Sequence, residues 1–342
     1  MGSSAPLVCI CIPTFNAATT IRETLLSIFD QTYGNLAIHI SDNASTDETL
    51  KVIEAMADFR VTIHRNAENI GGEGNFNRCI QLAEGKYTAI FHADDVYEPD
   101  MVAKQVEFLE AHPEAGAVFT EASLIDDVGH KIGGIHLPQG IVSKNGLYDF
   151  ATMFKAVLRH SNFFICPSFM VRTQVYQQEI IIWRGELFGS GADLDVWLRI
   201  LQNHLLGHLP EQLIQYRISD NQFSARVRLE TNPGIIFKII DHYLEQDRVK
   251  EMLNATDLLN YKWLERRDRV GRAINLFLMD RSQEAGRLLR DVYSWDALRA
   301  ALRSKRGLLV LASGIYVRLL VVLGLNKIGK SSLTYIKQVT RK

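Results

Sequence analysis

Cysteine is scarce in this sequence, and its few cysteines are not spaced as metal ligands or as a disulfide framework. The 342 residues contain four, Cys9, Cys11, Cys79 and Cys166, and no Cys-x-x-Cys pair. Three of the four lie inside apolar runs, where thiols are commonly buried. The pattern argues against a structural zinc site and against a disulfide-stapled secreted domain. It favours a reducing compartment.

A secretion signal and a strong charge imbalance are also missing. The first residues, MGSSAPLVC, show no basic segment followed by an apolar core, so we expect no signal peptide and a cytoplasmic location. The formal net charge is −1, which gives no reason to expect nucleic acid as a partner. Hydrophobic residues make up 47% and charged residues 23% of the chain, a composition typical of a folded protein of one large or two ordinary domains.

What the sequence does have is a regular alternation of strand-like and helix-like segments up to about residue 125. The expected strands are 7–12, 36–41, 61–64, 87–92 and 115–125, and the expected helices are 19–31, 45–56, 74–85 and 101–112. Ser45 and Glu48 have capping-box spacing at the start of the second helix. The alternation predicts an α/β fold with a mostly parallel sheet covered on both faces.

The remaining segments are less regular. The patterns predict a hairpin near 126–134, a strand at 163–172, an amphipathic helix at 192–204 and a strand at 213–219. From Asn232 onward the pattern is helical, and we expect an appended helical region over residues 231–342.

Two adjacent carboxylates, Asp94 and Asp95, directly follow the fourth expected strand. Ligands of parallel sheets gather at the carboxyl ends of the strands. Neighbouring carboxylates repel each other, and burial would protonate one of them, unless a hard divalent cation such as Mg²⁺ or Mn²⁺ binds between them. The other interpretation is that they cap the helix after Pro99. The stretch alone leaves both open.

Six motifs occur in a fixed order: IPTFNAA, SDNASTDET, NIGGEGNFNRCIQLAEGKY, HADDVYEPD, GADLDVWLRI and YRISDNQFS. Together they resemble the family 2 glycosyltransferases (GT2), which are inverting enzymes with the GT-A nucleotide-sugar fold. The resemblance covers about residues 6–224. It implies a catalytic domain over residues 1–230, with a nucleotide-sugar half at about 1–125 and an acceptor half at about 126–230. It also implies a nucleotide-diphosphate sugar donor and Mn²⁺ or Mg²⁺ as cofactor.

The resemblance assigns the donor-binding residues. Pro13, Thr14 and Asn16 match the loop that lines the nucleotide-base pocket, and Asp42 matches the carboxylate that hydrogen-bonds the nucleoside. From the residues alone, Asp42 can equally be a turn former before the next helix.

Two asparagines and an arginine complete the donor-binding set. Asn75 and Asn77 match the stretch that closes over the nucleotide, and hydrogen bonding within the loop and helix start is their other interpretation. Arg217 can pair with the diphosphate or form a buried structural ion pair.

The metal ligands and the base follow in the same way. Asp94 and Asp95 match the later carboxylates of the family's metal motif, in which His92 stands for the usual first Asp. Many relatives carry a histidine where this chain has Ser219, so Asp220 or Asn221 can take its place as a metal ligand.

Asp193 matches the catalytic carboxylate that deprotonates the acceptor hydroxyl in an inverting displacement. The family usually has Glu in front of it, where this chain has Ala192. Without the resemblance, the position of Asp193 at the start of a helix would indicate an N-cap.

The end of the chain is basic. From Ala297 onward it contains ten Lys and Arg and no Asp or Glu, and residues 307–325 form an apolar stretch interrupted by Arg318. A central arginine disfavours a membrane span. Attachment of residues 299–342 to an anionic membrane surface and packing within the protein are the two main alternatives.

The leading hypothesis is a metal-dependent inverting glycosyltransferase that uses a UDP-sugar and a glycan or lipid-linked glycan acceptor in cell-surface polysaccharide or glycolipid assembly. It would act in the cytoplasm, at the inner face of the membrane. Two alternatives stay open: a nucleotidyltransferase that uses the same carboxylates, and a nucleotide-sugar-binding protein without activity.

Overall fold

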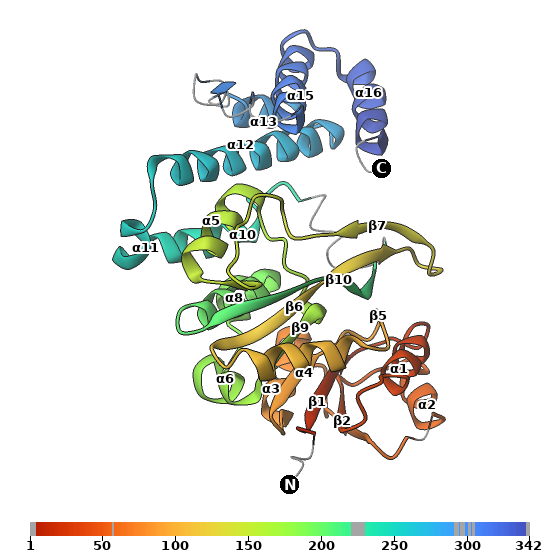
Figure 1. Cartoon of the computed structure of the whole chain (residues 1–342). Coiled ribbons are helices and arrows are strands. Elements are labelled where there is room, and N and C mark those ends of the chain that lie inside the picture. Colours follow the sequence, from red (N-terminus) through yellow and green to blue (C-terminus); the bar gives the residue numbers. More distant parts are fainter. Residues whose placement is uncertain are drawn as a thin grey trace. The chain divides into compact units, whose positions relative to one another are not determined.

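The computed structural model describes residues 5–56, 58–219, 230–290, 294, 298–299, 302 and 305–339 (Figure 1). The chain divides into two compact units. The first consists of Met1–Phe154 and Asn162–Ser219, and the second of Lys155–Ser161 and Asp220–Lys342. The change of unit after Ser219 lies close to the domain boundary that the sequence suggests at residue 230.

The sheet of the first unit begins with four parallel strands in the order β3-β2-β1-β4. They are β1 (Val8–Thr14), β2 (Leu36–Asp42), β3 (Val61–Arg65) and β4 (Tyr87–Ile90). Thr14 pairs with Asp42, so the carboxyl ends of β1 and β2 lie side by side. These four strands and the α/β fold class are confirmed.

The other half of the sheet is largely antiparallel. Strand β9 (Phe169–Arg172) runs antiparallel between β4 and β6 (Ala115–Ile125), and β10 (Leu205–Arg217) runs parallel to β6. The short strands β5 (Val96–Tyr97), β7 (Lys131–Ile135) and β8 (Leu147–Tyr148) add antiparallel pairs. The sheet is therefore mixed, and the expected parallel pairing is complete only over β1 to β4, because an apolar run does not encode strand direction.

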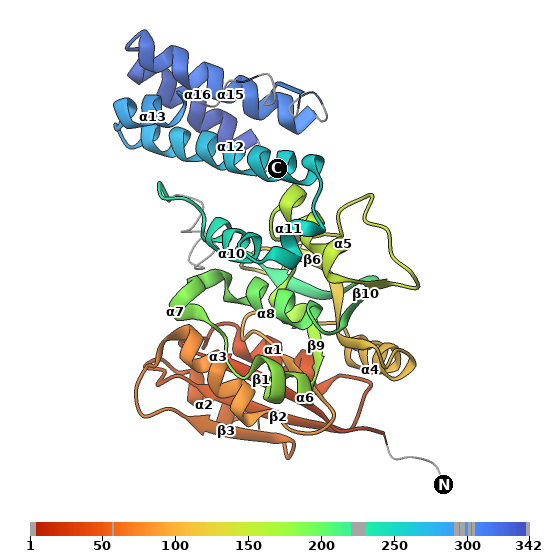
Figure 2. The ribbon, with the colours of Figure 1, turned by 90° about the vertical axis from the view of Figure 1, so that its left-hand side faces the viewer.

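Both faces of the central strand are buried. Residues 8–12 of β1 all have 0% exposure, although alternate side chains of a strand point to opposite faces. On one face they pack in a core with Ile21, Leu25 and Ile28 of α1 (Ile21–Phe29). On the other, the Cys11 thiol donates to the carbonyl of Cys79 in α3 (Gly71–Leu82). Helices α2 (Thr49–Glu54) and α4 (Met101–Ala111) complete this half (Figure 2).

The capping box expected at Ser45 and Glu48 is wrong. Helix α2 starts at Thr49, and its N-cap residue, Glu48, makes no side-chain cap hydrogen bond. The Ser45 hydroxyl instead accepts a hydrogen bond from the backbone N–H of Asn16 at 3.0 Å. Asp47 takes over the capping contact by accepting from the N–H of Thr49 at 3.0 Å.

The expected strand at 163–172 is shorter than predicted. Residues Cys166–Ser168 form a 3₁₀ turn with Pro167 in its first positions, and β9 starts only at Phe169. Proline has no N–H for a sheet ladder, which explains the late start. The hairpin is confirmed, since β6 and β7 pair antiparallel on either side of residues 126–130.

The acceptor half adds two short helices and two longer ones. Helices α6 (Thr173–Val175) and α7 (Gly185–Phe188) precede α8 (Ala192–Leu201), and α5 (Phe150–His160) lies at the change between the units. Leu194, Trp197, Leu198 and Leu201 of α8 are buried, as their helical spacing predicts.

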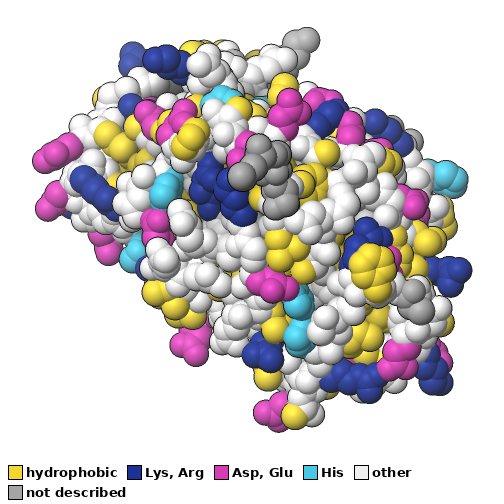
Figure 3. All heavy atoms as spheres, turned by 60° about the horizontal axis from the view of Figure 1, so that its bottom comes forward, with side chains coloured by type: hydrophobic (Ala, Val, Ile, Leu, Met, Phe, Trp, Pro, Cys, Tyr) yellow, Lys and Arg dark blue, Asp and Glu magenta, His cyan; other side chains and the backbone are white. Residues whose placement is uncertain are grey.

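The second unit is helical, as expected. Its helices are α10 (Ile235–Leu244), α11 (Asp247–Glu251), α12 (Ala255–Leu278), α13 (Ser282–Leu288), α15 (Lys305–Val322) and α16 (Asn326–Val339). Its core contains Phe277, Leu289, Val317 and Leu333. Among the described residues, no helix combines the length and the apolar character that crossing a membrane requires. On the face of the molecule shown in Figure 3, basic, acidic and hydrophobic side chains are interspersed.

Candidate active site

The carboxylates that the sequence singles out lie in the short connection between β4 and β5. One ligand atom each from His92, Asp94 and Asp95 can be chosen so that all three lie within 4.8 Å of one another. The connection is fixed at both ends, because β4 pairs with β1 and β9, and Tyr97 of β5 pairs with Ile214 of β10. The grouping brings together the three metal ligands predicted on this loop.

Helix α1 holds the same loop from the side. The Thr20 hydroxyl donates to the carbonyl of Ala93 at 3.0 Å, and the Thr24 hydroxyl donates to the carbonyl of Asp95 at 2.8 Å. The Ser27 hydroxyl accepts from the N–H of Tyr97 at 3.1 Å. Three hydrogen bonds from one helix therefore fix the backbone on which the carboxylates stand.

Asp95 is fully buried, and only one of its oxygens is satisfied by the protein. Oδ1 accepts from the backbone N–H of Arg217 at 2.8 Å, whereas Oδ2 has no hydrogen-bond partner among the described residues. Burial, reinforced by the charge of Asp94, raises the pKa of Asp95 well above its usual range, and the contact with Arg217 opposes this only in part.

The neighbouring imidazole is also incompletely satisfied. Burial lowers the pKa of His92, against an opposing effect of Asp94, and its Nε2 atom has no partner within the described part of the chain. A neutral imidazole and two carboxylates are donors that Mn²⁺ accepts, and a divalent cation would keep both carboxylates ionised. These residues therefore fit the metal that the resemblance implies.

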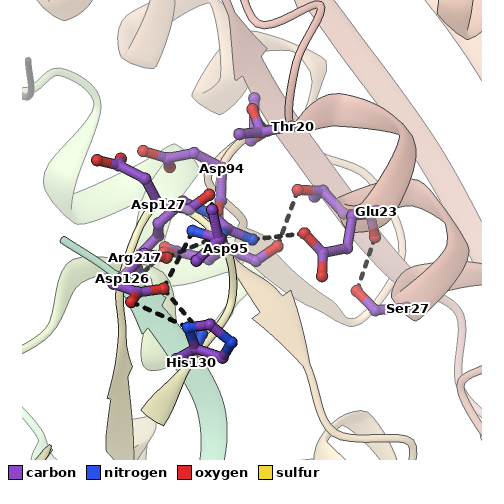
Figure 4. Close-up of polar contacts among 12 residues, drawn as sticks. Thr20, Glu23, Ser27, Asp94, Asp95, Asp126, Asp127, His130 and Arg217 are labelled. Carbon is purple, nitrogen blue, oxygen red and sulfur yellow. Dashed lines mark hydrogen bonds and ion pairs between the residues drawn. The ribbon is translucent and has the colours of Figure 1, made fainter. Parts of the chain in front are cut away.

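Arg217 connects the loop between β4 and β5, called the metal loop below, to two distant segments (Figure 4). Its side chain is buried, and its Nε donates to the carbonyl of Asp94 at 2.8 Å. One terminal nitrogen donates to the carbonyls of Asp126 and Asp127 at 3.0 and 3.2 Å, and the other forms an ion pair with Glu23 of α1 at 2.5 Å. An ion pair is therefore present but is buried only on the Arg217 side, since the Glu23 side chain is 56% exposed, and pairing with a diphosphate stays a prediction.

The turn after β6 also lies at this site, which the sequence did not indicate. The Asp126 carboxylate accepts from the N–H groups of Val128 and His130, at 3.0 and 2.8 Å, and so shapes the turn. In Figure 4 the side chains of Asp94 and Asp127 point to the same side.

Asp42 lies at the carboxyl end of β2 and is 1% exposed. Its Oδ2 accepts from the N–H of Ser45 at 3.2 Å, which is the contact of a turn former. Its Oδ1 is buried without a partner among the described residues, so one acceptor atom is left over for a ligand.

The neighbouring loop at the end of β1 is held by hydrogen bonds to the loop that follows β2. Asn16 has a positive φ of 49°, and its side-chain oxygen accepts from the N–H of Thr46 at 2.8 Å. Pro13 and Thr14 are the last two residues of β1, beside Ser41 and Asp42 of β2. The loop residues and Asp42 are therefore brought together as predicted.

The side chains of Asn75 and Asn77 both make hydrogen bonds within the protein. The Asn75 amide exchanges two hydrogen bonds with Ser41, of 2.6 and 2.9 Å, and Asn77 exchanges two with the backbone of Trp183, of 2.7 and 3.4 Å. These contacts are structural, but they reach Ser41 on β2 and the distant Trp183 rather than staying within the loop and helix start as expected, and a role in closing over the nucleotide stays a prediction.

Asp193 lies in the first turn of α8, whose N-cap residue is Gly191. Burial of the carboxylate raises its pKa to about 6, although the backbone N–H groups of Leu194 and Asp193 itself and the amide of Asn162 partly offset this effect. A carboxylate with a pKa near neutrality suits a general base. Asn162 was not expected at the site.

The second acid of α8, Asp195, is different. It is fully buried, and it forms ion pairs with Arg184 and with Arg199, the latter at 3.0 Å. Its charge is compensated within the fold, so it is a structural residue.

Two further side chains link the metal carboxylates to Asp193. Burial raises the pKa of Tyr216, and so do the charges of Asp95, Asp94 and Asp193, among others. Burial followed by the charges of Asp193 and Asp95 raises the pKa of Cys166. The carboxylates of Asp95 and Asp193 therefore both lie within electrostatic range of the Tyr216 and Cys166 side chains. Asp220, predicted as a further metal ligand, and Asn221 lie outside the described residues.

A mixed sheet flanked by helices, with acidic side chains after β2 and β4 and another at the start of α8, has the architecture of the GT-A glycosyltransferases. The family described as glycosyl transferase family 2 matches residues 9–179, and the chain belongs to this family.

Relatives and solved structures agree with this class. An uncharacterized glycosyltransferase of Haemophilus influenzae is 28% identical over 281 residues, which cover 79% of this chain and 85% of that protein. The glucosyltransferase WfaP of Escherichia coli is 35% identical over 104 residues, covering 30% of this chain and 41% of that protein.

Among solved structures, Staphylococcus aureus TarS 1–349 with UDP-GlcNAc superposes with a TM-score of 0.63 at 16% identity, covering 94% of this chain and 92% of that one. The mannosyltransferase PcManGT of Pyrobaculum calidifontis, with GDP-Man and Mn²⁺, gives a TM-score of 0.54 at 18% identity, covering 96% and 87%. At these identities the likeness shows the fold.

The contacts of Arg217 lead to a test that does not need a substrate. Arg217→Lys keeps the positive charge but loses the planar donor set that holds Asp94, Asp126 and Asp127. We expect Mn²⁺ affinity, measured by calorimetry or by electron paramagnetic resonance, to fall about 10- to 100-fold.

Arg60→Lys is the matched control, because Arg60 is also partly buried and paired with a carboxylate, that of Asp58. It should leave Mn²⁺ affinity unchanged. Unchanged affinity in a folded Arg217→Lys variant would show that Arg217 does not position the metal ligands.

Proposed function

We propose that the protein is a metal-dependent inverting glycosyltransferase that moves a sugar from a nucleotide diphosphate to an acceptor hydroxyl. The observation that carries this proposal is the grouping of His92, Asp94 and Asp95 after β4, together with Asp193, whose charge acts on the same Tyr216 and Cys166 side chains as that of Asp95. One set suits a cation on a diphosphate, and the other is a single carboxylate with a raised pKa. An inverting displacement needs these two parts on opposite sides of the transferred sugar.

On the donor side, Asp42 and the loop of Pro13, Thr14 and Asn16 would hold the nucleoside. The Oδ1 of Asp42 supports this role, because it is buried and has no hydrogen-bond partner within the described ranges, and such an acceptor suits a base N–H or a ribose hydroxyl. Asp94 and Asp95, assisted by His92, would hold Mn²⁺ or Mg²⁺. When bound, such an ion neutralises charge on a leaving diphosphate. PcManGT with GDP-Man and Mn²⁺ supports this assignment.

On the acceptor side, Asp193 acts as the base. Its carboxylate takes the proton of the acceptor hydroxyl, the acceptor oxygen forms a bond to the anomeric carbon, and the bond from that carbon to the diphosphate breaks. The pKa of about 6 leaves Asp193 ionised at neutral pH while keeping it basic enough to accept the proton. The Asn162 amide and the backbone N–H groups of the helix start keep the carboxylate in place.

The substrate classes rest on the relatives. WfaP is named for the use of UDP-Glc and of a GlcNAc-diphosphoundecaprenol acceptor, and TarS is solved with UDP-GlcNAc. We therefore propose a UDP-sugar as donor and a glycan, free or carried on a lipid diphosphate, as acceptor. A lipid-linked acceptor would place the reaction in the cytoplasm at the inner face of the membrane, in the assembly of a surface polysaccharide or glycolipid.

The proposal is tested by incubating the purified chain with UDP-, GDP- and dTDP-sugars, with and without Mn²⁺, and measuring release of the nucleotide diphosphate. We expect release from one donor class, dependent on Mn²⁺. Asp94→Asn should weaken both metal and donor binding. Asp193→Asn should retain donor binding and lose transfer by a factor of about 100 or more, as loss of a general base does.

The outcomes separate the alternatives. Full transfer by Asp193→Asn would refute the assignment of the base. Nucleotide binding without release from any donor would favour a binding protein, and release of sugar 1-phosphate rather than a nucleotide diphosphate would favour a nucleotidyltransferase.

The raised pKa of Asp193 also predicts a pH dependence. With saturating metal and donor, kcat should fall as the pH drops below about 6, because the protonated carboxyl cannot accept the acceptor proton. The free energy of unfolding should change with pH in the opposite direction to kcat. Asp193 has its ordinary pKa of 3.8 in the unfolded chain and about 6 in the folded one, so the wild type loses stability as the pH rises through this interval.

Asp193→Asn removes this titration and serves as the control. The difference in unfolding free energy between Asp193→Asn and the wild type should grow in favour of the variant from about pH 4 to about pH 6 and stay constant above. A pH-independent difference would contradict the raised pKa.

A further inference from the structure

Helix α15 exposes an apolar stripe along one face. The exposed fractions are 45% for Leu308, 45% for Ile315, 53% for Leu319 and 74% for Val322. These positions recur at helical spacing, so their side chains lie on one side of the helix. Exposed hydrophobic residues scattered singly need no explanation, but a contiguous row of them marks an interaction surface.

The stripe is not a loosely packed core face. The opposite side of α15 contributes Val317 and Leu320, with 0% and 3% exposure, to a core with Phe277, Leu289 and Leu333. The helix is therefore already anchored in its own unit, where it contacts α12 and α13 (Figures 1 and 2). Leu309 and Leu323, 49% and 63% exposed, widen the apolar face beyond a single row.

The part of the chain that carries the stripe is rich in bases. Residues 220–342 contain 23 Lys and Arg against 13 Asp and Glu, whereas residues 1–219 contain 15 against 26. From Ala297 to the end there are ten bases and no acid. Arg299 before the helix and Lys327 after it are exposed. This separation contrasts with the face in Figure 3, where both signs are interspersed.

We propose that the α15 stripe, defined as Leu308, Ile315, Leu319 and Val322, docks the protein on an anionic lipid surface. The apolar side chains enter the boundary between headgroups and acyl chains, and the flanking bases contact the lipid phosphates. Face-to-face pairing of two copies would bring two acid-free basic segments together, whereas anionic lipid neutralises them. This inference does not depend on the proposed activity.

The experiment measures binding of the full-length protein to vesicles by co-sedimentation, without donor or acceptor. Vesicles of phosphatidylcholine with about one third phosphatidylglycerol should bind the wild type, and vesicles of phosphatidylcholine alone should bind it at least about tenfold less. Leu319→Gln with Val322→Gln should reduce partitioning into the anionic vesicles by about tenfold or more, because two apolar insertions are lost. Arg299→Gln with Lys327→Gln should reduce it by a similar factor.

The matched control is Phe59→Gln with Val142→Gln, which removes two apolar side chains of the first unit that are 97% and 81% exposed. It should bind like the wild type. Equal binding by the stripe variant and the control, or no preference for anionic vesicles, would overturn the proposal. So would a wild-type dimer in light scattering that the stripe variant converts to a monomer without any change in vesicle binding. Since no sugar is transferred in this assay, its failure would leave the glycosyltransferase proposal untouched.

Discussion

The structure depends on how a buried carboxylate is tolerated at the end of β4. Asp95 is completely enclosed beside Asp94, and its Oδ2 accepts no hydrogen bond from the described residues, with His92 Nδ1 3.7 Å away. An ionised group in such a place is unfavourable unless a positive charge compensates it. Arg217 supplies part of the compensation through its backbone N–H and holds the loop through its guanidinium. The negative charge that Arg217 leaves uncompensated suits a divalent cation. Such a cation would explain why the two acids are adjacent.

The parallel and the antiparallel halves of the sheet position different candidate site residues. Parallel strands deliver Thr14, Asp42 and the metal loop to one edge, where a nucleotide diphosphate can be held. The antiparallel strand β9 then carries the chain across the sheet toward α8, which presents Asp193. Strand β10 pairs with β6 and with β5, and the backbone N–H of its last residue, Arg217, donates to Asp95. The loop of Asp94 and Asp95 is therefore tied to the second half of the sheet.

Sequence patterns predicted the features that depend on neighbouring residues. Apolar runs and helical spacing predicted β1 to β4 and the major helices, and Asp94 and Asp95 were singled out because they are adjacent in the sequence. Contacts between distant segments were not predictable. Arg217 pairs with Glu23, which is 194 residues away in the sequence. The sequence near Asp193 likewise gives no sign that Asn162 donates a hydrogen bond to it. The predicted Ser45 capping box was wrong for the same reason. The backbone N–H of Asn16, which is distant in the sequence, donates to the Ser45 hydroxyl instead. Adjacent motifs thus located the site, but the groups that hold it in place are set by tertiary structure.

The central claim is that a cation bound by Asp94 and Asp95 meets the diphosphate of the donor. It is tested most directly by anomalous diffraction from crystals soaked with Mn²⁺ and UDP. We predict a manganese peak at a bonding distance of about 2 Å from oxygens of Asp94 and Asp95 and from the diphosphate. A bound diphosphate with no manganese at these carboxylates, or with both side chains turned away from it, would contradict the account.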